Sequence, residues 1–275
     1  MLSSAAGAVV VPGYGTLLES GWLEVTEKTV PLAGCGLKRN VRVLHLSDLH
    51  VGPDDASYEV ASEAITLGLR QRPEAAFLTG DYITQGRVPD LARFGETLRR
   101  LSAEIPVFAS FGNHDGGVWS AGEGGVSDIA IVRDLLEKSG IRCLHNEAAP
   151  LELPGQAINV AGIGDFWAVD FEPDRAFSSI KRTDRPTIVL SHNPDTTVPL
   201  GAHHWDLQLS GHTHGGQVVV PVIGPPYVPV SDHRFIRGLV PWRGRQVHIS
   251  RGIGSILGIR INCRPEVSML NLTAG

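Results

Sequence analysis

An α/β fold is predicted for this chain, and three observations lead to that prediction. Short apolar runs, each followed by a polar side chain, recur along the sequence. Segments with apolar residues at helical spacing separate the first of these runs. The chain has 275 residues, enough for one large core or two smaller domains. Because strands that alternate with helices pair in parallel through right-handed crossovers, the first half predicts a parallel sheet.

Five apolar runs are interpreted as buried strands because they are short and bounded by Gly, Asp, Asn or Pro. These runs cover residues 41–47, 75–80, 106–112, 187–191 and 207–211. The second half of the chain is rich in Gly and Pro and predicts further short strands. These lie at residues 157–163, 217–220, 246–250 and 267–272.

Three helices are predicted between the early strands, at residues 58–72, 89–101 and 127–138. Each carries apolar side chains on one face, as expected for a helix that covers a sheet. Pro89 lies near the start of the second segment, where proline is tolerated. Ser127 is a suitable N-cap for the third.

The composition is that of an ordinary globular protein. Apolar residues make up 42% of the chain, charged residues 19%, and the net charge is −5. This balance, without a Lys/Arg cluster, argues against disorder and against specific nucleic-acid binding. Cys35, Cys143 and Cys263 are far apart, so neither a disulfide framework nor a thiolate zinc site is expected. We expect all three to be buried or half-buried apolar side chains.

The N-terminal segment allows two interpretations. Residues 5–11 form an apolar run that is too short to cross a bilayer and lacks a preceding basic stretch. It is either a loosely docked terminus or the remnant of a targeting segment. Residues 1–39 are therefore expected to hold this run and a lead-in strand, ahead of the main domain at residues 40–275.

Polar residues that bind metals follow the predicted strands. They are Asp48 and His50, Asp81, Asn113 and His114, His192, and His212 and His214. Ligands gather at the carboxyl ends of strands in such sheets, so these side chains are expected in one site. Two divalent ions held close together repel, and a carboxylate such as that of Asp81 can bridge them. Oxygen and nitrogen ligands suit manganese, iron or zinc, without choosing among them.

The ordered motifs resemble those of the calcineurin-like metallophosphoesterases. They are Ser47-Asp48-Leu49-His50, Gly80-Asp81, Gly112-Asn113-His114-Asp115, His192 and Gly211-His212-Thr213-His214. The resemblance runs from about residue 41 to residue 272. It is strongest to a bacterial branch that is often exported or membrane-attached. Features of that branch are the extension of the last motif to Gln217, a Pro-rich stretch at 222–230, an Arg-Gly segment at 251–254 and Cys-Arg-Pro-Glu at 263–266.

The resemblance implies a four-layer α-β-β-α sandwich of two mixed sheets flanked by helices, formed by residues 40–275. It also implies a two-metal site. Asp48, His50 and His214 would hold one ion; Asn113, His192 and His212 would hold the other; and Asp81 would bridge them. A hydroxide between the ions would attack phosphorus in line.

His114 would protonate the leaving oxygen or stabilise charge on the phosphoryl group, and Asp115 would orient His114. Purple acid phosphatases, which share much of the pattern, place a tyrosine ligand three residues after the bridging Asp. Thr84 stands there in this chain, so a tyrosinate-bound ferric site is not expected.

The resemblance therefore favours a phosphodiesterase over a phosphomonoesterase. A UDP-diacylglucosamine-type pyrophosphate hydrolase is the alternative among enzymes, and a metal-bound protein-interaction scaffold is the non-enzymatic one. A scaffold should have replaced some ligands, yet His114 and all seven candidate ligands remain. The substrate class stays open among small-molecule, nucleotide and lipid-linked phosphoesters. Peripheral membrane association and an exported location are expectations from the branch, and a cytoplasmic location also stays open.

Other residues are interpreted as structural or as part of a rim. The remaining histidines (His45, His145, His203, His204, His233 and His248) are expected to be packed or solvent-facing, although His203 or His233 could touch substrate. Residues 222–230 are expected to be a rigid loop packed on the core, or else a substrate rim or membrane-facing surface. Trp119, Trp167 and Tyr227 are candidates for such a rim. Residues 116–125 are Gly-rich and are expected to form a mobile loop beside the site.

Overall fold

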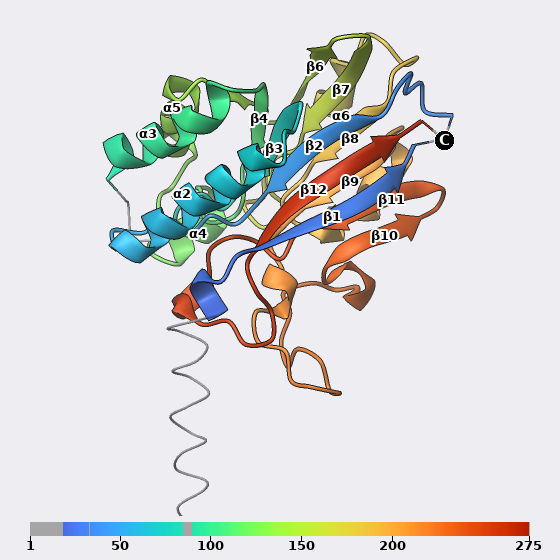
Figure 1. Cartoon of the computed structure of the whole chain (residues 1–275). Coiled ribbons are helices and arrows are strands. Elements are labelled where there is room, and N and C mark those ends of the chain that lie inside the picture. The colour runs from blue at the N-terminus through green and yellow to red at the C-terminus, as the bar shows by residue number, and fades with distance from the viewer. Residues whose placement is uncertain (1–18, 33, 85–89, 275) are drawn as a thin grey trace, which may run out of the picture.

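The fold is built on two six-stranded mixed sheets (Figure 1). The computed structural model describes residues 19–32, 34–84 and 90–274. The first sheet has the order β1 (Glu24–Pro31), β12 (Glu266–Thr273), β2 (Val41–Leu46), β3 (Ala75–Thr79), β4 (Val107–Ser110) and β5 (Arg142–Cys143). The second has the order β10 (Gly238–Trp242), β11 (Arg245–Ile249), β9 (Leu207–Ser210), β8 (Thr187–Leu190), β7 (Gln156–Gly162) and β6 (Glu147–Leu153).

Parallel pairing is concentrated where the chain alternates between strands and helices. Strands β2, β3, β4 and β5 run parallel, as do β7, β8, β9 and β11. The antiparallel pairs are β12 with β2, β6 with β7 and β10 with β11. The parallel core predicted from the first half is therefore confirmed, and each sheet is mixed.

Helices cover the outer faces of both sheets. Figure 1 shows α2 (Asp55–Arg70), α3 (Leu91–Ser102) and α5 (Ala130–Lys138) on one side of the first sheet. Outside the second sheet lie α6 (Pro173–Ser178), η2 (Pro194–Thr197) and η3 (Pro199–Ala202). The remaining short elements are η1 (Glu19–Gly21), α4 (Val118–Gly122), η4 (His214–Gly216), η5 (His233–Phe235) and η6 (Ile256–Gly258).

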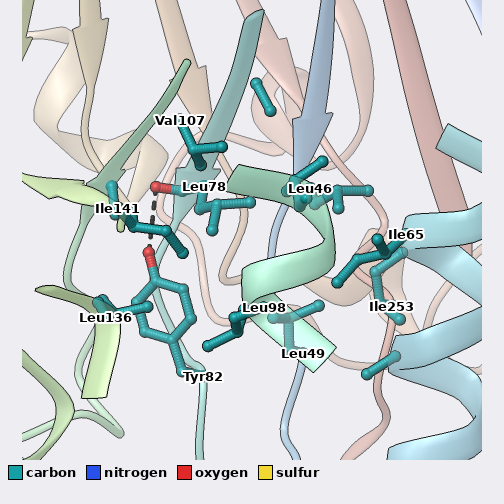
Figure 2. Close-up of a cluster of buried hydrophobic side chains, with 14 of the residues drawn as sticks. Leu46, Leu49, Ile65, Leu78, Tyr82, Leu98, Val107, Leu136, Ile141 and Ile253 are labelled. Carbon is teal, nitrogen blue, oxygen red and sulfur yellow. Dashed lines mark hydrogen bonds between the residues drawn. The ribbon is translucent and has the colours of Figure 1, made fainter. Parts of the chain in front are cut away.

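Three layers of buried apolar side chains confirm the four-layer sandwich. One lies between α2, α3, α5 and the first sheet, one between the two sheets, and one outside the second sheet. Figure 2 shows the first layer, where Leu98 of α3 and Ile65 of α2 share a cluster with Leu78 of β3. Leu98 is fully buried, so its truncation to alanine would cost about 2–5 kcal/mol.

The caps explain where the helices begin. The Asp54 side chain accepts the backbone N–H of Ser57, so α2 starts before the predicted Tyr58. Asp90 caps α3, while the predicted start at Pro89 lies outside the described residues. The prediction of Ser127 as the cap of α5 is wrong, because Asp128 accepts the N–H of Ala130 and the helix starts there.

Three edge strands were not predicted, and one predicted strand is wrong. Strand β5, of two residues, lies at an edge of the first sheet. Strands β6 and β10 lie at the edges of the second sheet and contain Pro150 and Pro241, which lack an N–H for pairing. Residues 217–220 form only isolated bridges. Gln217 has φ 52°, and Pro221 follows the segment, so regular pairing does not extend.

Strand β1 lies inside the predicted N-terminal segment and pairs in parallel with β12. The apolar run at residues 5–11 lies outside the described residues. Within the described ranges, no helix combines the length and apolar character needed to span a bilayer.

Candidate metal centre

The predicted site residues converge where strands of both sheets end. Asp48 and His50 follow β2, Asp81 follows β3, and Asn113, His114 and Asp115 follow β4. From the second sheet, His192 follows β8, and His212 and His214 follow β9. All nine side chains are buried. Five stretches that are distant in sequence therefore meet at one point.

Within this site the His and Asp side chains fall into three overlapping groups. In each group, one ligand atom from every residue lies within 4.8 Å of the others. The groups are Asp48, His50 and His214; His50, Asp81 and His114; and Asp81, His192 and His212. Asp81 belongs to two of them. It therefore adjoins histidines that follow strands of the first sheet and histidines that follow strands of the second sheet. This arrangement can hold two cations with Asp81 between them.

The His192 ring shows why a cation belongs there. Its Nδ1 lies 2.6 Å from the carbonyl oxygen of Thr79. A carbonyl only accepts, so Nδ1 carries the proton and Nε2 presents a lone pair. That Nε2 lies 3.0 Å from Oδ2 of Asp81. Two acceptors at this distance need a positive charge between them, either a proton or a metal ion.

The pKa of His192 agrees with this geometry. Burial opposes the charged ring, but the carboxylate of Asp81 outweighs burial and raises the pKa of His192 well above its ordinary value. In the metal-free protein a proton therefore occupies the position between the two side chains. A bound divalent ion would replace it.

The other histidines keep their lone pairs. Burial and the neighbouring His114 lower the pKa of His50 to about 3, and burial with His192 lowers the pKa of His212 to about 3. Burial and His50 lower the pKa of His214 well below its ordinary value. Nε2 of His50 and Nε2 of His214 lie 3.1 Å apart, and Nε2 of His212 is buried without a hydrogen-bond partner. Neutral imidazoles with facing or unpaired nitrogens fit a metal site.

The buried carboxylates of the site also favour a bound cation. Burial and the Asp81 charge raise the pKa of Asp48 to about 6. Oδ1 of Asp48 lies 3.4 Å from Nε2 of His214. Oδ1 of Asn113 lies 3.0 Å from Nδ1 of His212, which puts an amide oxygen at the other end of the site. The donor set is therefore oxygen and nitrogen, as predicted, and it fits two divalent ions.

The local backbone is strained where the side chains must turn inward. Asp48, His50, Asp81, His212 and His214 all have positive φ values, between 45° and 68°. Such a conformation costs about 1–3 kcal/mol for a residue with a side chain. Each of the five lies two to four residues after the end of a buried strand. Strained backbone thus coincides with the candidate ligands.

The glycine of the last motif is required by a close approach. A Cβ at Gly211 would lie 2.0 Å from Oγ of Ser47 and 2.1 Å from Oδ2 of Asp48. Glycine therefore lets the loop after β9 pack directly on the Asp48 side chain. The backbone N–H of His212 donates to Oδ1 of Asp48 at 3.0 Å, which joins the two strand ends.

The expected contact between Asp115 and His114 is wrong. Oδ2 of Asp115 accepts the backbone N–H groups of Asp81 and Gly112, both at 2.8 Å, and Oδ1 accepts the N–H of Tyr82 at 2.7 Å. Asp115 therefore ties the loop after β3 to the loop after β4. Its carboxylate is occupied by amides because both loops leave N–H groups unpaired where their strands end.

His114 lies next to Asp81 and to α4. Its Nε2 is 3.9 Å from Oδ2 of Asp81, and its Nδ1 is buried without a partner. The Trp119 ring lies beside it, with ring centroids 4.7 Å apart. Trp119 belongs to α4, so the Gly-rich segment 116–125 contains a helix rather than only the predicted loop.

Two residues near the site were missed. Asp165, 2% exposed, follows β7, and burial raises its pKa to about 6, with His192 and Asp81 also acting on it. The signal was present, since Gly164-Asp165 follows its strand as Gly80-Asp81 does. Arg260 is fully buried, donates to the carbonyls of Arg251, Gly252, Gly254 and Cys263, and lies 3.4 Å from Nδ1 of His214. No sequence pattern marked Arg260.

The histidines that were set aside lie apart from the cluster. His45 and His248 are buried and contact each other across the two sheets, with their Nδ1 atoms 3.0 Å apart. The prediction that His45 is packed is confirmed, and its Nε2 lies 2.8 Å from Oγ1 of Thr79 in the neighbouring strand β3. His203 stacks on Phe177 of α6.

Two further predictions on side chains were tested. Cys143 and Cys263 are buried and Cys35 is half-buried, as predicted. The interpretation of residues 222–230 as a loop packed on the core is wrong for Val222, Ile223 and Tyr227. These side chains are at least 73% exposed. Gly224 has φ +93° and forms an isolated bridge with Val220, so the segment begins with a tight turn.

Comparison with known proteins gives a consistent result. The family profile described as "Calcineurin-like phosphoesterase" matches residues 41–216. Phosphodiesterase YaeI of Escherichia coli (strain K12) is 36% identical over 263 residues, covering 94% of this chain and 92% of that protein. The uncharacterised metallophosphoesterase YkoQ of Bacillus subtilis (strain 168) is 31% identical, covering 86% and 84%. UDP-2,3-diacylglucosamine pyrophosphatase LpxG of Chlamydia trachomatis is 27% identical, covering 84% and 83%.

Proposed function

The chain belongs to the calcineurin-like phosphoesterase family and is a phosphoester hydrolase, and on this premise we propose that it cleaves phosphodiesters with two bound divalent ions. The family uses a dinuclear metal centre, and the His and Asp groups of this chain can bind metal. The observation that carries the proposal is the 3.0 Å approach of His192 Nε2 to Asp81 Oδ2. Two lone pairs meet there and need a cation between them.

The residues divide into two ligand sets. Asp48, His50 and His214 would hold one ion, as one compact group of donor atoms. His192 and His212 would hold the other with Asn113, whose Oδ1 lies against the His212 ring. Asp81 would serve both sets, since its Oδ2 lies 3.0 Å from His192 and 3.6 Å from His50. Manganese, iron and zinc all suit these donors.

The bound ions would lower the pKa of water and offset negative charge on the phosphoryl oxygens. The protein's own side chains supply orientation and proton transfer. His114 lies beside the half-buried Trp119 ring, with its Nε2 3.9 Å from Oδ2 of Asp81, so it would be placed to reach the leaving oxygen of a phosphoester bound at Asp81. Burial lowers the pKa of His114. The negative charge of a bound phosphodiester would favour its protonated form, which could then donate a proton to that oxygen.

A substrate screen tests the proposal. The purified chain is loaded with Mn, Fe or Zn and assayed on bis(p-nitrophenyl) phosphate and on p-nitrophenyl phosphate. We expect faster turnover of the diester and loss of turnover after chelation. Absence of turnover on either ester with all three metals would contradict an enzymatic role and favour the scaffold.

A pyrophosphate substrate is the second candidate, because LpxG of Chlamydia trachomatis carries the name of a UDP-2,3-diacylglucosamine pyrophosphatase and aligns over most of this chain. A UDP-sugar is therefore included in the screen. Release of UMP at a rate above that of diester cleavage would favour this candidate over the phosphodiesterase.

A further inference from the structure

Two tryptophans form one wall beside the candidate metal centre. The Trp119 ring lies 4.7 Å from the His114 ring, and the Trp167 ring lies 4.4 Å from the His212 ring, measured between centroids. The two indoles contact each other at 5.9 Å. Both are half-buried, so each keeps part of its ring surface open to solvent. The wall thus touches one candidate metal ligand and the candidate proton donor.

Trp167 is held rigidly. It lies in the loop between β7 and α6, and Asn146 ties the two ends of that loop together. Oδ1 of Asn146 accepts the N–H groups of Gly164 and Glu172, and its Nδ2 donates to Asp170 O. Inside the loop, Oδ1 of Asp165 accepts the N–H of Trp167 at 2.8 Å. These hydrogen bonds fix the backbone that carries the Trp167 ring, so a ligand that stacks there needs little ordering of the loop.

Trp119 is fixed against the same loop. Gly117, at the start of α4, has φ +92°, and a Cβ there would lie 2.8 Å from Cβ of Ala168. Only glycine allows α4 to approach the Trp167 loop this closely. The two indoles are therefore set at a defined spacing before any substrate binds.

The two segments that carry the wall expose apolar side chains and lack positively charged ones. Val118, Phe166 and Val169 come from the same two segments and are 69%, 43% and 77% exposed. Residues 114–131 and 164–171 contain no Lys or Arg. A second phosphate on this side would find no cation in these segments. A neutral ring would find two aromatic faces.

We propose that Trp119 and Trp167 form a stacking surface for a planar, uncharged ring carried by the substrate's leaving group. The inference rests on the proposed function, because His114 locates the leaving oxygen and Trp119 adjoins His114. The ring is either a simple aryl group or a nucleobase, since both present the same π face. Stacking would hold the ester bond in line with the centre.

Binding of small phosphates tests this without requiring turnover. The Mn-loaded full chain is titrated with phenyl phosphate and with ethyl phosphate, which differ in the ring. Stacking on aromatic side chains predicts about tenfold tighter binding of phenyl phosphate. In Trp119→Ala and Trp167→Ala the ratio should fall to about twofold or less. Trp119→Phe should keep most of it, because a ring remains.

Controls separate stacking from other effects. Trp22→Ala removes an exposed tryptophan that packs under Arg264, and it should leave the ratio unchanged. Metal content and circular dichroism identify misfolded variants, and Trp167→Leu, which fills space without a ring, then replaces Trp167→Ala. A second pair of ligands, uridine 5′-monophosphate and ribose 5-phosphate, distinguishes the two kinds of ring. If the affinity ratio is larger for this pair than for phenyl and ethyl phosphate, the ring is a nucleobase. If it is smaller, the ring is a simple aryl group.

The outcomes separate the two proposals. A wild-type ratio near one, or a ratio unchanged in both alanine variants, overturns the stacking surface. A wild-type protein that shows the ratio and its loss in the variants, yet cleaves no diester, supports the stacking surface and removes the phosphodiesterase proposal.

Discussion

Nε2 of His192 lies 3.0 Å from Oδ2 of Asp81, while Nδ1 of the same ring contacts the carbonyl oxygen of Thr79 at 2.6 Å. The backbone carbonyl selects the tautomer, and the tautomer directs a lone pair at a carboxylate. A proton and a metal ion therefore compete for the position between these two side chains. That competition makes metal binding dependent on pH.

Metal binding should release a proton, and the stabilisation by metal should increase with pH. The Asp81 carboxylate raises the pKa of His192, overcoming burial. A histidine whose pKa rises on folding stabilises the fold below its unfolded value of about 6.5, and this stability is lost as pH rises through the folded value. The chelated protein should therefore lose stability with rising pH. The metal-loaded protein should not.

Melting temperatures from about pH 6 to about pH 9, with Mn and with chelator, measure this difference. Calorimetry in two buffers of different ionisation enthalpy counts the protons released. A constant gap between the two melting curves would contradict the prediction. His204→Gln is the control, because that ring is exposed and lies beside Asp206 rather than Asp81.

Asp81→Ala should lower the occupancy of both metal positions. The side chain belongs to two of the three donor groups, so its loss removes a donor from each set. Elemental analysis should show a fall from about two ions per chain to well below one. Asp134→Ala removes an exposed carboxylate paired with Lys138 and should keep full occupancy. Two ions retained in the Asp81 variant would exclude the bridging role.

His114→Gln should slow esters with poor leaving groups more than p-nitrophenyl esters. An alkoxide needs a proton as it departs, whereas p-nitrophenolate is already stable. Loss of general acid catalysis predicts about a 100-fold decrease for an alkyl leaving group and under about tenfold for p-nitrophenol. Steady-state rates over a leaving-group series measure this. Equal slowing across the series would instead indicate that His114 positions the phosphate.

Asp115→Asn should destabilise the fold by about 2–3 kcal/mol. Both carboxylate oxygens accept backbone N–H groups. Asparagine replaces one of these oxygens by an NH2 group. That donor would face either the N–H groups of Asp81 and Gly112 or the N–H of Tyr82. Chemical denaturation measures the free energy of unfolding. Asp184→Asn, at an exposed pair with Arg182, should change it by less than about 0.5 kcal/mol. An unchanged Asp115 variant would show that the loops after β3 and β4 do not depend on this tie.

Arg260→Lys should destabilise the protein by about 3 kcal/mol and weaken metal binding. The guanidinium spans the carbonyls of Arg251, Gly252 and Gly254, and a lysine ammonium cannot reach all of them. The segment from 251 to 254 packs on Asp48 and His50 through Gly252 and Gly254. Denaturation and metal titration measure the two effects. Arg99→Lys, on the exposed face of α3, should change neither.

Much of the fold could be predicted from local pattern. Buried parallel strands are continuous apolar runs, and the structure places β2, β3, β4, β8 and β9 at those runs. Edge strands β6 and β10 escaped prediction because their pairing is one-sided and tolerates proline, which weakens the pattern. Residues 217–220 have a strand-like sequence, but positive φ at Gln217 prevents regular pairing.

The candidate ligands were identified because metal chemistry restricts residue type and strand ends restrict position. Arg260 and the partners of Asp115 could not be identified in the same way. Their roles depend on which backbone groups from other segments are left unpaired nearby. No spacing within one segment of sequence carries that information.

By itself, the sequence determined the α/β class, the family resemblance and the residues with the chemistry to bind metal, because these follow from side-chain type and local period. Only the tertiary structure decided that His192 opposes Asp81, that Asp115 ties two loops together and that two tryptophans adjoin His114 and His212. Most of these relations join loops that follow different strands. Packing sets such distances, and packing depends on the whole chain at once.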